Sequence, residues 1–74
     1  MKKIQYKGFT IEAETGTDPQ VEVTISKTVN GTFYHGSIGA AENEGLCNED
    51  WTRLIRVPVS VLDKAYDLEE SLLS

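Results

Sequence analysis

The chain has 74 residues, of which 39% are hydrophobic and 26% are charged, and its formal net charge is −5. At this length only about 60% of the surface of the unfolded chain is buried on folding, so we expect a single domain, residues 1–74, of marginal stability. The composition is that of a globular protein and excludes a disordered chain, and no apolar run has the length of a transmembrane helix or a signal-peptide core.

The N-terminal residues predict a β-hairpin. Polar and apolar side chains alternate through MKKIQYKGFTIE, and a turn at Lys7-Gly8 places Tyr6 opposite Phe9. Alternation requires one half-buried face, which collects Ile4, Tyr6, Phe9, Ile11 and Ala13. Turn-forming residues with a proline then end the pattern at 15–19.

A second hairpin is predicted by the strictly alternating stretch 20–29 and the Asn30-Gly31 pair that follows it. Asn-Gly favours a type I′ turn, because both central residues of that turn need a positive φ. Folding about it pairs Val29 with Thr32 and Val23 with Ile38. The predicted core face holds Val21, Val23, Ile25, Tyr34 and Ile38. The opposite face holds Glu22, Thr24, Ser26, Thr28, Phe33, His35 and Ser37, a polar set that includes one exposed phenylalanine.

The C-terminal third predicts a short strand and a helix. Residues Thr52–Val57 are rich in β-branched side chains, which favours a fifth strand over a short helix. Pro58 or Ser60 then begins a helix, and Asp63 completes a capping-box spacing with Ser60. The helix carries an apolar stripe of Val61, Ala65, Leu68 and Leu72, flanked by Leu62, Tyr66 and Leu73.

These elements predict an α+β fold: an antiparallel four- to five-stranded β-meander with one C-terminal α-helix packed on one face. The stretch Gly39–Trp51, with sequence GAAENEGLCNEDW, connects the second hairpin to the last strand. It holds four acidic residues and no basic residue, and it therefore carries almost all of the net negative charge.

The acidic stretch does not match the residue patterns of an EF-hand, a structural zinc site or a Cys–His catalytic pair. Placing Gly45 at position 6 of an EF-hand loop puts Ala40 and Trp51 at positions 1 and 12, where calcium ligands are required. Cys47 and His35 are two soft ligands where a structural zinc site needs four. The predicted register also leaves His35 beside Ser26 on the outward sheet face, without a group to orient a Cys–His pair. The glycine spacing matches no phosphate-binding loop. We therefore expect a non-enzymatic protein with no cofactor and no metal.

Partners are indicated by the charge. An acidic chain lacks the basic footprint that binding to phosphates requires, so we expect no direct nucleic acid and no membrane. The single cysteine, Cys47, cannot form an internal disulfide and favours the cytoplasm. A partner protein that presents Lys and Arg fits instead. The predicted partner-binding residues are Glu42, Glu44, Glu49, Asp50, Trp51, Asp63, Asp67 and Glu70.

In size and charge the chain resembles the short accessory proteins of phages and mobile elements, including anti-CRISPR inhibitors. The resemblance implies an inhibitor or regulator, in the cytoplasm of the host cell, that docks on a basic surface of a nucleic-acid-handling protein. Two alternatives stay open. The first is a structural or assembly module, a homodimer joined through the outward sheet face that bears Phe33. The second is a metal-dependent enzyme or sensor built on the acidic stretch.

Overall fold

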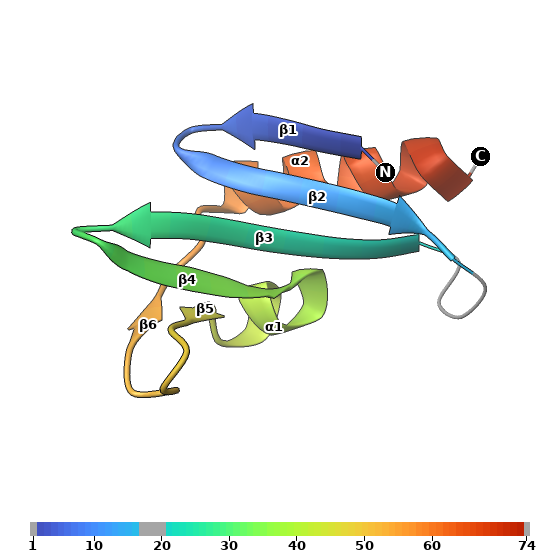
Figure 1. Ribbon diagram of the computed structural model, residues 1–74. Helices are drawn as coiled ribbons and strands as arrows, with labels where there is room; N and C mark the ends of the chain where they lie inside the picture. Colours follow the sequence, from blue (N-terminus) through green and yellow to red (C-terminus); the bar gives the residue numbers. More distant parts are fainter. Residues whose placement is uncertain (1, 17–20, 74) are drawn as a thin grey trace.

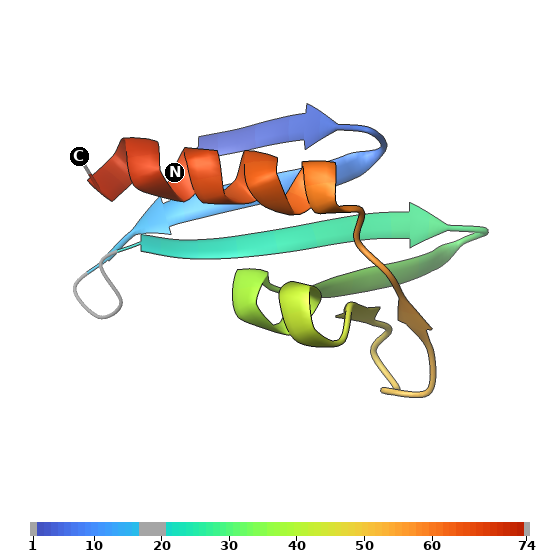
Figure 2. The same cartoon turned by 180° about the vertical axis from the view of Figure 1, so that it is seen from behind.

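The computed structural model describes residues 2–16 and 21–73 and contains one antiparallel sheet with both helices on the same face (Figures 1 and 2). The sheet order is β1-β2-β3-β4-β5-β6, so each strand pairs with the next one in sequence. The elements are β1 (Lys2–Tyr6), β2 (Phe9–Thr15), β3 (Val21–Val29), β4 (Thr32–Ser37), α1 (Ile38–Asn43), β5 (Leu46–Cys47), β6 (Leu54–Ile55) and α2 (Val59–Leu73). The predicted α+β class is confirmed, with six strands in place of four or five and with a short second helix.

The first hairpin has the predicted register. Tyr6 lies opposite Phe9, and the turn residues Lys7 and Gly8 have positive φ angles of 51° and 83°. The pairing continues to Lys2 and Ala13 at the far end of β1. The predicted turn segment that follows β2 falls at 17–20, outside the described residues.

The second hairpin is confirmed around its turn and wrong at its far end. Asn30 and Gly31 have φ angles of 50° and 82°, as a type I′ turn requires, and Val29 pairs with Thr32. The ladder ends at the pair Thr24–Ser37, so the predicted Val23–Ile38 pair does not form. Ser37 caps a helix instead: its Oγ accepts a hydrogen bond from the backbone N–H of Ala40, 3.3 Å away.

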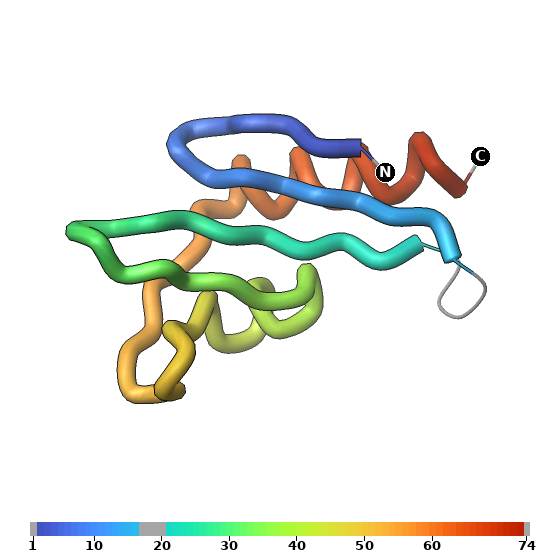
Figure 3. The backbone as a smooth tube through the Cα atoms, viewed as in Figure 1, coloured from blue at the N-terminus to red at the C-terminus, as the bar shows by residue number. Residues whose placement is uncertain are grey.

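The acidic stretch is therefore more ordered than the predicted connection. Residues 38–43 form α1, and the chain then returns to the sheet as β5, which pairs with β4 through the single register pair His35–Cys47. Of the strand predicted at Thr52–Val57, only β6 is in the ladder, where Leu54 pairs with Cys47. Figure 3 shows the rest of that segment leading the chain from the sheet edge to the start of α2.

Helix α2 begins one residue after Pro58, whose carbonyl oxygen accepts hydrogen bonds from the N–H groups of Val61 (3.0 Å) and Leu62 (3.2 Å). The capping box predicted from Ser60 is wrong, because Ser60 lies inside the first helical turn. Its hydroxyl oxygen is held by the Nζ of Lys7 at 2.8 Å.

The core lies between the sheet and the two helices. The three predicted stripe residues at the centre of α2, namely Val61, Ala65 and Leu68, are buried against the predicted core faces of β2 and β3. Among the described residues, the buried apolar residues are Phe9, Ile11, Ala13, Val21, Val23, Ile25, Tyr34, Ala41, Leu46, Val61, Ala65 and Leu68. Among the described residues, no helix is long and apolar enough to cross a membrane.

Candidate functional site

The turn between β5 and β6 is built around the side chain of Asn48. Asn48 Oδ1 accepts hydrogen bonds from the N–H groups of Thr52 and Arg53, both at 3.0 Å, and Asn48 Nδ2 donates to Thr52 Oγ1 at 3.1 Å. The Asn48 carbonyl oxygen also accepts from the N–H of Trp51 at 3.1 Å. Short polar side chains stabilise tight turns in this way. One residue thus fixes the five-residue stretch that contains Glu49, Asp50 and Trp51.

This turn presents Trp51 to solvent. The side chain is 81% exposed, and the backbone has a φ of 61°, in the left-handed region that non-glycine residues rarely adopt. A bulky residue in this conformation costs roughly 1–3 kcal/mol, and such strain gathers at functional sites. Full exposure of a large indole also runs against the usual placement of aromatic side chains. Two unfavourable features therefore coincide at one residue.

Next to this turn, the outward face of β4 carries a stacked pair of rings. The rings of Phe33 and His35 have centroids 5.4 Å apart and an interplanar angle of 22°. Phe33 is 49% exposed, as the predicted alternation required. On the same face, Cys47 lies across from His35 and Leu54 lies across from Cys47, with Leu54 55% exposed. An apolar strip therefore crosses three strands at the β6 edge of the sheet.

Two shallow hollows connect this strip to the turn. One, of about 310 Å³, is lined by Gly31, Thr32, Phe33, Asn48, Glu49 and Asp50. The other, of about 280 Å³, is mostly apolar and is lined by His35, Gly36, Ser37, Ala40, Glu44, Gly45, Cys47 and Trp51. Carboxylates thus border both hollows. We call this region the aromatic–acidic surface and define it by Phe33, His35, Cys47, Trp51 and Leu54, with Glu44, Glu49 and Asp50 at its rim.

The other predicted binding residues lie in the helical layer, which covers the opposite face of the sheet. Asp63, Asp67 and Glu70 are exposed on α2. Glu42, on α1, accepts a hydrogen bond from the hydroxyl of Tyr66 on α2. Of the eight predicted residues, Glu44, Glu49, Asp50 and Trp51 therefore lie on the aromatic–acidic surface and the remaining four lie among the helices. The two groups adjoin at a hollow that Glu42 and Glu44 both line.

The contact between the helices changes the acidity of Tyr66. Because the Glu42 carboxylate accepts the phenolic hydrogen bond, it favours the protonated phenol and raises the pKa of Tyr66 above 10.0. Desolvation and the negative charges of Glu42 and Glu69 act in the same direction.

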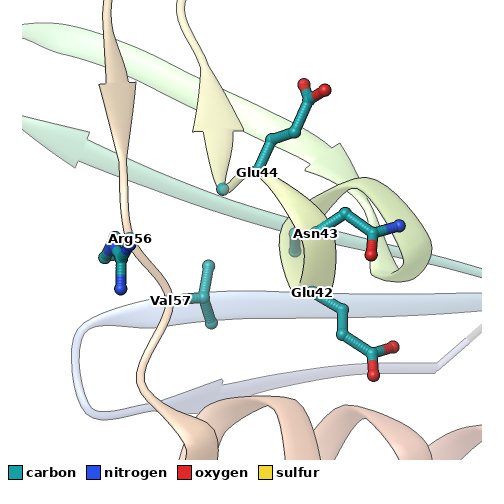
Figure 4. A pocket seen from close by; sticks show the side chains of 7 residues that line it. Glu42, Asn43, Glu44, Arg56 and Val57 are labelled. Atoms are coloured by element: carbon teal, nitrogen blue, oxygen red, sulfur yellow. The ribbon is translucent and has the colours of Figure 1, made fainter.

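Figure 4 shows the Glu42 side chain pointing away from that of Glu44, with Arg56 and Val57 on the other side of the hollow that they share.

The acidic residues do not gather around a cation position. Within residues 2–16 and 21–73, no group of three or more His, Cys, Asp or Glu side chains could hold a metal ion. The predicted register placed Ser26 beside His35, and this pair is present between β3 and β4. On its other side, His35 also pairs with Cys47 of β5, which the sequence did not predict. Across the described chain, neither the Cys47 nor the His35 side chain takes part in a hydrogen bond, so no third group orients the pair.

Sequence reasoning found Phe33 as an exposed aromatic residue and Trp51 as a possible anchor, and it missed that they share one surface. The two residues come to one surface because the chain returns to the sheet through α1 and β5. The sequence contains one feature that predicts the start of α1. Ser37 precedes a stretch of good helix formers, Ala40 to Glu42, which is the pattern of an N-cap.

No family model, curated protein or solved structure matches the chain.

Proposed function

We propose that this protein is a non-enzymatic, acidic protein-binding module, an inhibitor or regulator that docks on a basic surface of a nucleic-acid-handling protein. The observation that carries the proposal is Trp51, held exposed on a left-handed backbone between two acidic residues and the Phe33–His35 stack. A region of this make-up has the anatomy of a protein interface, with aromatic residues at the centre and polar residues at the rim.

The chemistry of the surface favours a partner that presents arginine. A guanidinium group stacks on an exposed indole, and its planar fork pairs with a carboxylate through two hydrogen bonds. Trp51 supplies the ring, and Glu49 and Asp50 supply carboxylates in the same turn. Proteins that handle nucleic acids carry such cationic side chains in the grooves that contact phosphates.

The charge of the whole chain supports the same partner. A net charge of −5 on so small a domain raises the rate of encounter with a basic surface and repels competing acidic proteins. The second acidic group, on the helices, adds to this long-range field without belonging to the contact. The size and charge that the chain shares with anti-CRISPR inhibitors of phages support an anti-defence role in the cytoplasm of a host cell.

The proposal is tested by capture from the producing cell and by binding measurements with the captured protein. We expect the wild type to retain a nucleic-acid-handling protein in a salt-sensitive manner. The variant Trp51→Ala should weaken that complex by about 2 kcal/mol, the size typical of an interface hot spot. Glu49→Gln with Asp50→Asn should lower mainly the association rate and its dependence on salt.

Matched controls come from the helical layer. Asp63→Asn with Asp67→Asn removes the same charge from the opposite face, so it should preserve affinity apart from a small loss of association rate. Asn48→Ala removes the three side-chain hydrogen bonds that hold the turn and should weaken binding although it changes no charge. Equal binding by the wild type and Trp51→Ala would contradict the proposal.

A second candidate function is favoured by one observation. Phe33 and Leu54 are exposed on a single sheet face, which would suit a homodimeric assembly module. Sedimentation equilibrium distinguishes the two functions: a dimer that Leu54→Ser converts to a monomer, together with failure to retain any basic partner, would establish the module in place of the inhibitor.

A further inference from the structure

Three lysine side chains gather around one aromatic pair at the end of the molecule where α2 begins. Lys7 Nζ and Lys64 Nζ lie 5.6 Å and 5.5 Å from the centroid of the Tyr6 ring, and Lys27 Nζ lies 4.6 Å from the centroid of the Phe9 ring. Tyr6 and Phe9 are directly opposite each other in the first hairpin. A turn, a strand and a helix thus bring together the lysine cluster, defined as Lys7, Lys27 and Lys64.

Among the described residues, no carboxylate forms an ion pair with this cluster. Within residues 2–16 and 21–73, the only ion pair joins Lys3 to Glu12, with 3.9 Å between Nζ and Oε1. The first turn of α2 also carries no acidic residue. The chain has twelve acidic and seven basic residues, so three neighbouring lysines that form no ion pair are an exception in it.

Lys64 shows that the arrangement is not forced by a lack of acidic neighbours. Asp67 lies three residues further along α2, a spacing at which opposite charges form ion pairs on a helix. The Lys64 ammonium group lies over the Tyr6 ring instead. Departures of this kind from local rules are expected at functional sites.

We propose that the lysine cluster binds the dianionic phosphoryl group of a small phosphate ester. Lysine ammonium groups act as compact point charges with three donors each, which suits a tetrahedral anion with three acceptor oxygens. Flat carboxylates are matched better by arginine, and the cluster contains none. Ser60, whose hydroxyl oxygen accepts from Lys7 Nζ at 2.8 Å, adds a neutral polar group beside the ammonium groups.

The surroundings favour a small ester over a nucleic acid. A polyanion needs a track of basic residues along which successive phosphates lie. On α2, the exposed acidic residues Asp63 and Asp67 lie on either side of Lys64 in the sequence and Glu70 follows them, and these charges repel a long anion. The cluster lies on the helical side of the sheet, so the site is independent of the aromatic–acidic surface on the other side.

The test is a titration of the isotope-labelled protein with inorganic phosphate, against chloride at the same ionic strength, followed by amide chemical shifts. We expect saturable shifts confined to residues around Lys7 and Ser60, with a millimolar dissociation constant. The triple variant Lys7→Gln, Lys27→Gln, Lys64→Gln should bind at least about tenfold more weakly, which corresponds to about 1.4 kcal/mol.

The control variant Lys2→Gln, Lys3→Gln, Arg53→Gln makes the same change of net charge outside the cluster. It should keep the phosphate affinity within about twofold, since separated exposed charges are screened by salt. Shifts that rise linearly without saturation, or equal weakening in both triple variants, would overturn the proposal. If the cluster variant loses its dispersed spectrum, the three single substitutions take its place, and each should weaken binding.

A second set of titrations decides the class of ligand. Phosphoserine should compete with inorganic phosphate for the same amides. A short single-stranded oligonucleotide should bind more weakly than phosphoserine at equal phosphate concentration. Tighter binding of the oligonucleotide would replace the small ester by a nucleic acid as the ligand and would overturn the assignment.

Discussion

Gly45 shows how one residue connects the acidic stretch to the rest of the sheet. It ends the α1 turn, where its N–H donates to the carbonyl oxygen of Ala40 at 3.0 Å, and its φ of 118° belongs to a region that other residues avoid. A Cβ atom at this position would overlap the carbonyl oxygen of Ile55. Only glycine therefore allows β5 and β6 to approach this closely, and the position of the Trp51 turn depends on it.

We expect Gly45→Ala to lower the free energy of unfolding by about 2 to 4 kcal/mol, because it adds backbone strain and a clash with the backbone. Urea denaturation followed by far-ultraviolet circular dichroism measures the change. Gly39→Ala is the matched control: it lies in α1 with no atom within 4 Å of the added Cβ, and it should stabilise the protein by about 0.5 to 1 kcal/mol. Equal stability of the two variants would refute the assigned role of Gly45.

At the scale of elements, the two helices form one layer although they differ in how well each could form a helix by itself. Helix α2 has 15 residues and a strong apolar stripe, whereas α1 has six residues, too few to be stable by itself. α1 is held by the Ser37 cap, by burial of Ala41 in the core and by the Tyr66–Glu42 hydrogen bond to α2. Tertiary contacts therefore stabilise this helix.

The contact between the helices predicts a pH effect in the alkaline range. The pKa of Tyr66 is higher in the folded protein than its ordinary value of 10.0, so its contribution to stability is complete below pH 10. It is lost as the pH rises through the folded-state pKa. We expect the difference in melting temperature between the wild type and Tyr66→Phe to shrink above pH 10. Glu42→Gln removes the charge that raises the pKa, so this variant should show little of this alkaline loss of stability. A constant difference between the wild type and Tyr66→Phe would exclude the effect.

At the scale of the whole molecule, one apolar core supports two faces with different chemistry. The helical layer covers one face of the sheet and carries the lysine cluster and the second acidic group. The outward face is left to solvent and carries the aromatic–acidic surface. Because the domain is small, its stability depends on a few large contacts between α2 and the central strands.

Truncation of the α2 stripe should therefore cost a large part of the total stability. Leu68 is 7% exposed, and Leu68→Ala should lower the free energy of unfolding by about 2 to 4 kcal/mol through lost burial and a cavity. Leu73 is 52% exposed in the same helix, and Leu73→Ala should cost less than about 1 kcal/mol. Thermal unfolding by circular dichroism compares the two. Similar losses would show that α2 does not close the core as described.

The sequence by itself determined the parts of the fold that rest on local rules. Alternation fixed which residues of β1 to β4 face the core, and Lys7-Gly8 and Asn30-Gly31 fixed the registers, because a turn type allows only one pairing beside it. The period of 3.6 residues fixed the buried stripe of α2. The exposure of Phe33 followed from the same alternation.

The tertiary structure alone decided the arrangement of the acidic stretch and hence of the candidate site. The strands β5 and β6 have two residues each, too short for a periodic pattern, and they form because β4 offers an edge and Gly45 permits the approach. This step places Cys47 beside His35 and brings Trp51 to the same hollow as His35, and the side chains of Glu42 and Glu44 point away from each other. Charge is a property of sequence, but a surface depends on which distant side chains the fold brings together.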